Sequence, residues 1–442
     1  LKYFKRSEKN EIIEILKAVV ASPRDFVTDS IWNTVALALV PAEKKSMAHQ
    51  LYKNRLQYAL FGGAAIEEGA RNQMEIAMKL PITRAGALMP DAHQGYGLPI
   101  GGVLATNNAV IPYGVGVDIG CRMCLTAYPL DDRFLERHRT RLKKILLDNT
   151  YFGNEKASKP KDHAVLNRSE FQEITLLKKL QARAASQIGS SGSGNHFVEF
   201  GLLTLNEPND WRLAGGTYLA LLSHSGSRGL GAEIARHYTK LAKSVCYLPH
   251  EATNVAWLDL NTEAGQEYWL SMNLAGDYAS ASHHQIHARI GEALAEQPLL
   301  MVENHHNFAW KEILPDGCEA IVHRKGATPA GKGVLGIIPG SMTAPGYVVK
   351  GKGNSASLAS ASHGAGRVMS RSAAKQQITP KMVRQALQHH QVELLGGGVD
   401  EAPMVYKNIN EVMDYQQELV EVIGKFMPRI VRMCGDDSPA ED

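Results

Sequence analysis

The chain has 442 residues, of which 44% are hydrophobic and 21% charged, and its formal net charge is only +3. A chain of this length can bury a large core, and so small a net charge excludes a uniformly basic coat; a polyanionic partner would have to meet a local patch. The five cysteines are odd in number and scattered, which favours a reducing, cytoplasmic setting over a disulfide framework. No signal peptide or membrane span is expected, because no apolar run is long enough.

The first 60 residues are predicted to be helical, because Ile12, Leu16 and Val19 recur at steps of four and three. From residue 62 onward, short apolar runs divided by glycine predict strands at 101–111, 196–203, 218–224, 299–304 and 319–323. Longer helical patterns lie at 130–148, 170–187, 263–297, 380–394 and 409–427.

This mixture predicts an α+β fold built around a sheet, without internal repeats or a clear linker. We expect three segments: a helical extension, 1–60; a single sheet-centred domain with a metal-containing cleft, 61–435; and a disordered acidic tail, 436–442.

One window of the sequence is strongly basic. Between Ile321 and Lys375 there are eight lysines or arginines, ten glycines and no acidic residue. Basic side chains and exposed backbone N–H groups together favour a phosphate-binding surface over a merely solvated basic face.

The segment VDIGCRMC, 117–124, could be half of a zinc knuckle, a redox dithiol or one edge of an open metal site. No second cysteine or histidine pair follows at zinc-finger spacing, and CRMCLTAYPL continues as a predicted strand, which disfavours the first two. Asp118 and Cys121 are therefore the better ligand candidates, and Cys124 is read as a strand residue.

Several histidines stand beside small residues at predicted strand ends: His196, His224, His306 and His363. Together with Asp118 and Cys121 they form a ligand set suited to Mn²⁺, Zn²⁺ or Fe²⁺, and a bridging thiolate would allow two-metal phosphoryl chemistry. By contrast, His283 and His287 lack the glutamate of a metalloprotease motif and are expected on a helix surface. GKGVLG, 331–336, does not open a helix as a dinucleotide-binding loop would, and no Walker A motif is present.

At this point the sequence resembles the RtcB-type RNA ligases, the GTP- and manganese-dependent enzymes of tRNA splicing and RNA repair. The matching segments run in family order: MPDAHQGYGLPIGGV (89–103), GVGVDIGC (114–121), GSGNHFVEF (192–200), HSGSRGLG (224–231), HHN (305–307), VHRKGATPA (322–330), IPGSM (338–342) and SHGAGRVMSR (362–371).

The resemblance implies two Mn²⁺ ions with Cys121 between them, held by Asp118, Cys121, His196, His224 and His306. It implies that His363 attacks the α-phosphate of GTP and forms a guanylyl-histidine. It implies a nucleotide site made of Asn195, His196, Phe197, Val198, Glu199, His306, Asn307, Pro339, Gly340, Ser341, Met342, Gly364, Ala365 and Gly366. RNA phosphates would be met by Arg228, Lys325, Arg367 and Arg371.

The reaction implied opens an RNA 2′,3′-cyclic phosphate to a 3′-phosphate, activates that end with GMP and joins it to a 5′-hydroxyl. RNA and GTP are the expected partners, and no membrane is expected. Two positions depart from the family pattern: Gly346 stands where a serine is usual, and Cys434 where a lysine contacts the guanine. Two alternatives remain: a metal phosphodiesterase or phosphatase without nucleotide transfer, and a non-catalytic RNA-binding module.

Overall fold

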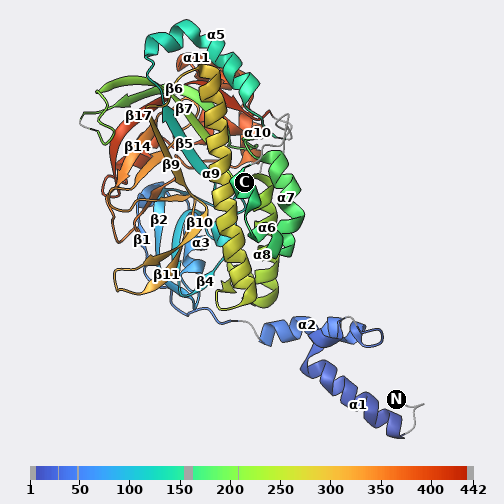
Figure 1. The fold of residues 1–442 in the computed structure, drawn as a ribbon. Coiled ribbons are helices and arrows are strands. Elements are labelled where there is room, and N and C mark those ends of the chain that lie inside the picture. Colours follow the sequence, from blue (N-terminus) through green and yellow to red (C-terminus); the bar gives the residue numbers. More distant parts are fainter. Residues whose placement is uncertain (1–5, 28, 47–48, 154–162, 208, 436–442) are drawn as a thin grey trace.

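A computed structural model describes residues 6–27, 29–46, 49–153, 163–207 and 209–435. The acidic tail expected at 436–442 lies outside these residues. The described chain is a mixed helix and sheet structure, as expected, with most strands in two sheets and the helices packed around them (Figure 1).

The larger sheet has eight strands and is mostly antiparallel. Along the sheet the order is β13 (Leu335–Ile338), β14 (Gly346–Gly351), β17 (Val420–Met433), β6 (Phe197–Leu205), β7 (Gly216–Ser225), β5 (Arg122–Ala127) and β9 (Leu300–His305), and β16 (Glu393–Leu395) also pairs with β17. Strand β5 is buried along its whole length, and apart from Arg122, which pairs with Glu303, it carries apolar and small residues on both faces.

The second sheet has five strands, in the order β1 (Ala59–Leu60), β2 (Thr83–His93), β3 (Ile100–Thr106), β11 (Glu319–Lys325) and β10 (Phe308–Ile313). Two short pairs join β12 (Ala327–Pro329) to β15 (Ser360–Ser362), and β4 (Ala109–Val110) to β8 (Leu258–Asp259). All five strand regions predicted from the sequence are present.

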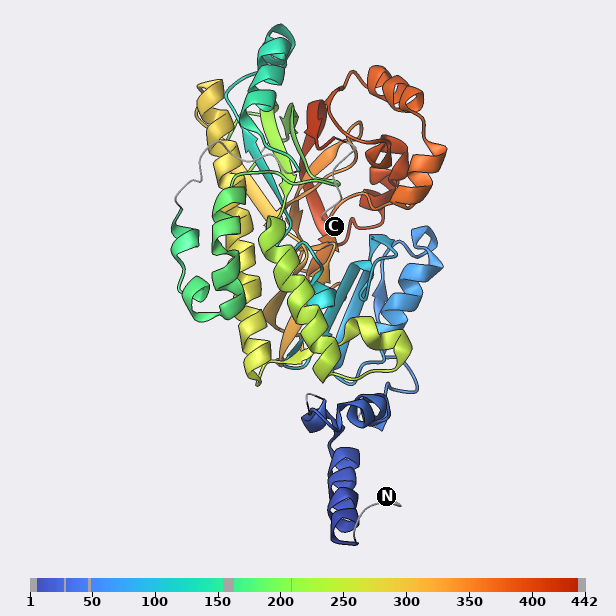
Figure 2. The ribbon, with the colours of Figure 1, turned by 90° about the vertical axis from the view of Figure 1, so that its right-hand side faces the viewer.

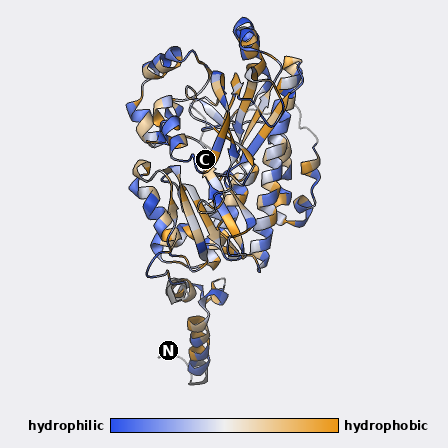
Figure 3. Cartoon of the chain, turned by 90° about the vertical axis from the view of Figure 1, so that its left-hand side faces the viewer, coloured by the Kyte–Doolittle hydropathy of each residue, from blue (hydrophilic) through white to orange (hydrophobic). Residues whose placement is uncertain are grey.

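The helices of the body are α3 (Glu68–Ala77), α4 (Pro112–Val115), α5 (Asp132–Asn149), α6 (Glu170–Glu173), α7 (Thr175–Gln187), α8 (Arg228–Val245), α9 (Glu263–Leu294), α10 (Arg371–Gln377), α11 (Pro380–His389) and α12 (Ile409–Asp414). Thr262 caps the N-terminus of α9, and its hydroxyl accepts from the Gly265 N–H. The helix lies against one face of the large sheet, beside α7 and α8 (Figures 1 and 2). The strands inside the body are mostly hydrophobic, whereas polar residues cover the outer faces of the helices (Figure 3).

Ahead of the body, α1 (Arg6–Ala21), a 3₁₀ turn (Pro23–Phe26) and α2 (Asn33–Ser46) project away from it (Figures 1 and 2). The helical part of the predicted extension therefore ends at Ser46, and residues 59–60 already pair with β2. The division of the chain into functional segments stays a prediction. None of the helices within the described ranges combines the length and the apolar character needed to cross a membrane.

Two predicted helices were wrong in part. Residues 409–427 form the short helix α12 and then enter β17, the long strand that pairs with both β6 and β14. Residues 380–394 form α11 only as far as His389, and the chain then adds β16 to the same sheet. In both places the spacing of the apolar residues fits a helix as well as a strand. Pairing within the large sheet favours the strand.

Candidate metal and nucleotide site

Four strand ends bring the predicted metal ligands to one edge of the large sheet. Cys121 directly precedes β5 and His196 precedes β6, whereas His224 lies at the end of β7 and His306 follows β9. These strands run antiparallel to their neighbours, so the starts of β5 and β6 meet the ends of β7 and β9. Asp118 joins them from the turn that leads into β5, and all five side chains are buried.

The turn before Cys121 depends on two glycines. Gly120 has φ +69°, and a Cβ there would lie 2.8 Å from the Gly276 Cα of α9. Gly226 follows His224, and a Cβ on it would overlap the carboxylate of Asp118. The motifs VDIGC and HSGS therefore carry glycine where the helix and the carboxylate come closest to the backbone.

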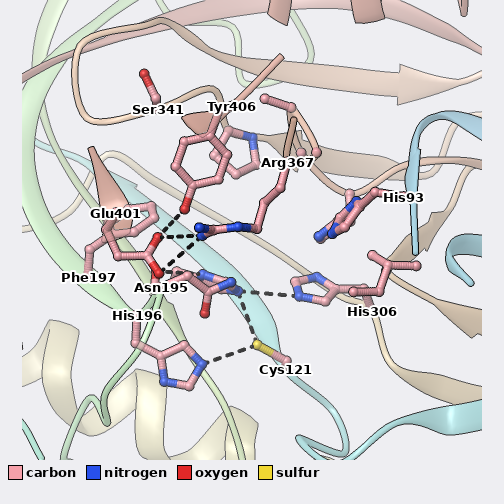
Figure 4. Close-up of a pocket in the computed structure, with 18 of the residues that line it drawn as sticks. His93, Cys121, Asn195, His196, Phe197, His306, Ser341, Arg367, Glu401 and Tyr406 are labelled. Atoms are coloured by element: carbon pink, nitrogen blue, oxygen red, sulfur yellow. Dashed lines mark hydrogen bonds and ion pairs between the residues drawn. The ribbon is translucent and has the colours of Figure 1, made fainter. Parts of the chain in front are cut away.

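The ligand atoms face one another at short distances (Figure 4). Cys121 Sγ lies 3.1 Å from His224 Nε2 and 3.5 Å from His196 Nε2. His196 Nε2 is also 3.1 Å from Asp118 Oδ2, and the Nε2 atoms of His224 and His306 are 3.3 Å apart. Ligands bound to one tetrahedral ion at its usual bond lengths are separated by about 3.3–3.7 Å, so this spacing fits a metal site.

The protonation of these groups also suits a cation. The Asn195 carbonyl accepts from His224 Nδ1, which leaves a lone pair on Nε2 facing the cluster. Burial lowers the pKa of His224 to about 3, and burial together with repulsion from His363 lowers the pKa of His306 well below its usual value. For Asp118, burial acts to raise the pKa, but the hydrogen bond from His196 and the charge of that ring outweigh it and lower the pKa. At neutral pH the imidazoles of His224 and His306 are therefore neutral and the Asp118 carboxylate is ionised.

The donor set also fits a bound metal. The ligand atoms of Cys121, His196 and His224 all lie within 4.8 Å of one another, close enough to share one ion. One thiolate, one carboxylate and three imidazoles suit a borderline divalent ion such as Mn²⁺ or Zn²⁺.

His363 stands beside this cluster at the end of β15, with its ring centroid 4.9 Å from that of His306. Its Nδ1 donates to Asp91 Oδ2 over 2.7 Å, and the backbone N–H groups of His363 and Gly364 donate to the same oxygen at 3.1 and 3.4 Å. A carboxylate can only accept here, so Nδ1 carries a hydrogen, and in the neutral form of the ring Nε2 holds the lone pair.

Asp91 was missed by the sequence reasoning, although its segment PDAHQG was among the matching motifs. It is fully buried at the end of β2. Burial acts to raise the pKa of Asp91, but the hydrogen bond and charge of His363 outweigh it, so the pKa is lowered. The only available signal was a carboxylate between a proline and small residues in an apolar strand, where a buried charge requires a partner.

Both groups open into one cavity of about 690 Å³. Of the predicted nucleotide residues, all line this cavity except Val198, whose side chain packs in the apolar core on the other face of β6. Glu199 lines the cavity without a side-chain partner in the described part of the chain, and burial raises its pKa well above the usual value. Such a carboxyl group is prepared to receive N–H donors from a ligand.

Three of the four predicted phosphate-binding cations also line the cavity: Lys325, Arg367 and Arg371. Acidic partners that the sequence reasoning did not identify hold the two arginines. Arg367 Nη2 donates to the Asp400 carbonyl over 2.8 Å, and Arg371 Nη1 pairs with the Asp400 carboxylate over 3.1 Å. Both guanidinium groups also pair with Glu401, which in turn accepts from the Tyr406 hydroxyl (Figure 4).

Arg228 does not line the cavity. It is 2% exposed at the start of α8, and its guanidinium donates to Ser190 Oγ over 3.1 Å and to the Gly153 carbonyl over 3.0 Å. Its position in the described structure therefore gives no support to the predicted RNA contact, because internal oxygens take its donors.

The two departures from the family pattern lie differently. Gly346 lines the cavity, as does Met433, whereas the Cys434 side chain packs in the apolar core with residues of α5 and β6. A lysine replacing Cys434 would therefore enter the core before it could reach the cavity.

The prediction that His283 and His287 lie on a helix surface was wrong. Both are buried on the sheet side of α9, behind the ligand cluster. His283 Nε2 donates to the Ser225 carbonyl over 3.1 Å, and Ser223 Oγ lies 2.8 Å from His283 Nδ1 and from His287 Nε2. His287 Nδ1 lies 2.7 Å from the Thr126 hydroxyl, so the histidines form one continuous hydrogen-bonded chain.

Comparison with known proteins shows the family of this chain. Residues 73–433 match the family described as tRNA-splicing ligase RtcB. The chain is 34% identical to RNA-splicing ligase RtcB1 of Escherichia coli ATCC 25922, with 82% of this chain and 93% of the relative covered. It is 28% identical to tRNA-splicing ligase RtcB of Thermococcus kodakarensis, with 80% and 88% covered. The chain therefore belongs to the RtcB family.

Proposed function

We propose that this chain is an RNA ligase that uses GTP and Mn²⁺ to join an RNA 3′-phosphate, or a 2′,3′-cyclic phosphate after its opening, to a 5′-hydroxyl. The observation that carries the proposal is the position of His363. His363 lines the same cavity as the ligand cluster, and Asp91 accepts from its Nδ1, which leaves Nε2 as the ring nitrogen available for attack. The names of the relatives, RNA-splicing and tRNA-splicing ligase, support the same activity.

In the first step, His363 Nε2 attacks the α-phosphorus of GTP. A P–N bond forms, the bond to the β-phosphate oxygen breaks and pyrophosphate leaves. The ring gains positive charge as the bond forms, and the Asp91 carboxylate stabilises that charge through Nδ1–H. Asp118, Cys121, His196, His224 and His306 would hold two Mn²⁺ ions, which offset the negative charge of the phosphates when bound.

In the second step, an oxygen of the RNA 3′-phosphate attacks the guanylyl phosphorus and releases His363, which gives RNA(3′)pp(5′)G. In the third, the 5′-hydroxyl attacks the RNA phosphate, and GMP leaves. Lys325, Arg367 and Arg371 line the cavity and are positioned to bind the phosphates of the RNA ends. For the two arginines this requires that phosphate replace the carboxylates of Asp400 and Glu401.

The base would lie where Phe197 and Glu199 of β6 pair with Met433 and Val431 of β17, since all four residues line the cavity. A neutral Glu199 carboxyl offers one acceptor and one donor, and an ionised one accepts from both the guanine N1–H and N2–H₂. We propose that guanine binding ionises Glu199. The cytoplasmic location expected from the cysteine pattern stays a prediction.

The test is incubation with Mn²⁺ and GTP labelled in the α-phosphate, followed by denaturing electrophoresis. The wild type should retain label, and His363→Ala should bind metal normally yet retain none. His389→Ala, which alters a histidine of α11 outside the cavity, is the matched control. Cleavage of cyclic-phosphate RNA without any protein-bound label would replace this proposal by the phosphodiesterase alternative. RNA binding without metal would leave only the binding module.

A further inference from the structure

The mouth of the cavity displays an aromatic side chain that none of the steps above uses. Tyr96 lines the cavity and is 70% exposed, the highest value among the large apolar and aromatic side chains that the structure describes from residue 49 onward. The ring of Tyr113, which also lines the cavity, lies beside it. The two rings are nearly parallel, with an interplanar angle of 7° and centroids 6.0 Å apart.

The backbone that carries Tyr96 is held firmly on both sides. The Gln73 amide brackets Gly95, donating to its carbonyl over 2.5 Å and accepting from its N–H over 3.0 Å. The Tyr96 carbonyl accepts from Lys325 Nζ. Gly97 has φ +74°, and a Cβ there would lie 2.6 Å from the Asn254 carbonyl oxygen. The ring is therefore exposed on an anchored loop, and a ligand would not have to order that loop.

Two lysines lie against the ring of Tyr113. Lys325 Nζ is 5.1 Å from the centroid of Tyr113, and Lys243 Nζ is 5.4 Å from it. Lys325 also donates to the Tyr113 carbonyl over 3.1 Å, so it links the ring pair to the wall of the cavity. A flat aromatic face next to cations suits a ligand that is itself flat and aromatic and is joined to an anion.

A nucleotide of single-stranded nucleic acid has this chemistry. Bases of single strands stack on aromatic side chains, while their phosphates bind basic residues along the same path. A paired duplex end could present only its last base pair, and a peptide would give the lysines no phosphate. Tyr96 lies at the cavity mouth, and Lys325 both lines the cavity and bonds to the two tyrosine carbonyls. This position favours a nucleotide close to the reacting RNA end.

We propose that Tyr96, supported by Tyr113, is the stacking platform for the nucleobase at one of the two RNA ends, with the adjoining phosphate directed towards Lys325. The proposal rests on the RNA ligase function, since that function supplies the substrate. It adds a base-binding subsite that accepts any of the four bases, because every base has a π-face.

The platform can be tested with two short single-stranded RNAs that carry fluorescent 2-aminopurine as their last nucleotide. One ends in a 3′-phosphate and the other begins with a 5′-hydroxyl. Stacking quenches this fluorophore, so at least one of the two RNAs should be quenched by the wild type and by Tyr96→Phe, but not by Tyr96→Leu. The same RNA should bind Tyr96→Leu about 5- to 150-fold more weakly, the range that one base–aromatic stack provides.

The controls separate stacking from other effects. Tyr52→Leu alters another exposed tyrosine, one that does not line the cavity, and this variant should bind the RNA as tightly as the wild type. Removing the terminal base should weaken binding to the wild type and leave binding to Tyr96→Leu unchanged. The salt dependence should be equal in all variants, because no charge is altered.

Unquenched fluorescence of both RNAs with the wild type, or equal affinity of the wild type and Tyr96→Leu, would overturn the platform. Formation of labelled guanylyl-His363 should be the same in all of these variants, because Tyr96 contacts neither His363 nor the predicted ligands. If that adduct forms while Tyr96→Leu binds RNA normally, the platform fails and the ligase proposal stands. If the wild type forms no adduct, the ligase proposal fails on its own measurement.

Discussion

Replacing Asp91 by asparagine removes one charge from the site with almost no change of shape. The Asp91 oxygen Oδ2 accepts from His363 Nδ1 and from two backbone N–H groups, whereas Oδ1 has no partner among the described residues. In Asp91→Asn the amide oxygen can keep the position of Oδ2, and the NH₂ group takes the position of Oδ1. The fold should therefore survive while the carboxylate charge is removed.

Two contributions set the size of the effect. A hydrogen bond to a charged group is stronger than a neutral one by about 1–1.5 kcal/mol. As His363 bonds to phosphorus, its ring becomes positive, and a full charge about 4 Å from a carboxylate is stabilised by about 4 kcal/mol at an effective dielectric constant of 20. The loss in Asp91→Asn should lie between these values, so guanylyl-His363 should form about 10- to 1000-fold more slowly.

The assay is the single-turnover rate of label transfer from GTP at saturating GTP and Mn²⁺, with metal content and thermal stability measured alongside. Asp316→Asn is the matched control, because Asp316 pairs with Arg84 at the surface and does not line the cavity. A wild-type rate in Asp91→Asn with full metal content would show that the carboxylate does not assist His363. A slow rate accompanied by metal loss would place its effect on the ligand cluster instead.

Three further outcomes are expected. Cys121→Ser should lose most of its bound metal and its ligase activity, because a hydroxyl is a poor ligand for these ions. Cys124→Ser, on the opposite face of β5, should keep both. The reverse result would show that the wrong cysteine has been assigned as the ligand. Burial lowers the pKa of Lys325 to about 7, so its charge is present below that pH and disappears as the pH rises through it. RNA affinity measured between about pH 6 and pH 8.5 should therefore fall in the wild type, but stay level in Lys325→Arg, and parallel profiles would remove Lys325 from the RNA site. Arg371→Ala should reduce the slope of log affinity against log salt by about 0.7 for each RNA phosphate that its guanidinium neutralises in the wild type, and an unchanged slope would place the RNA path elsewhere.

The sequence predicted the ligand cluster better than its surroundings. Cys121, His196 and His224 stand beside glycines at the ends of apolar runs, and such runs are recognisable as strands without knowing their partners. Which strand ends meet is set by pairing across the sheet, and here the four ends do meet at one edge. The motif order along the chain was therefore a sound guide to which side chains meet, and their role as metal ligands stays a prediction.

The parts that could not be predicted depend on contacts between distant segments. The partner of Asp91 is 272 residues away, and no local pattern shows which histidine a buried carboxylate will meet. Arg228 belongs to the matching segment HSGSRGLG, which implied an RNA contact, yet its guanidinium is buried and donates to Ser190. Strand β17 has apolar residues at both helical and alternating spacing, and only its pairing with β6 and β14 decides between them.

The hydrogen-bonded chain behind the cluster links the orientation of His224, a proposed metal ligand, to helix α9, which does not line the cavity. Side chains alternate along β7, so Ser223 and Ser225 face α9 while His224 between them faces the cavity. His283 is bonded both to the Ser223 hydroxyl and to the Ser225 carbonyl, which secures the backbone on each side of His224. Replacing His283 and His287 by phenylalanine would preserve the apolar packing but remove these hydrogen bonds to β7. If the cluster holds metal as proposed, its metal occupancy should then drop although all five proposed ligands are still present.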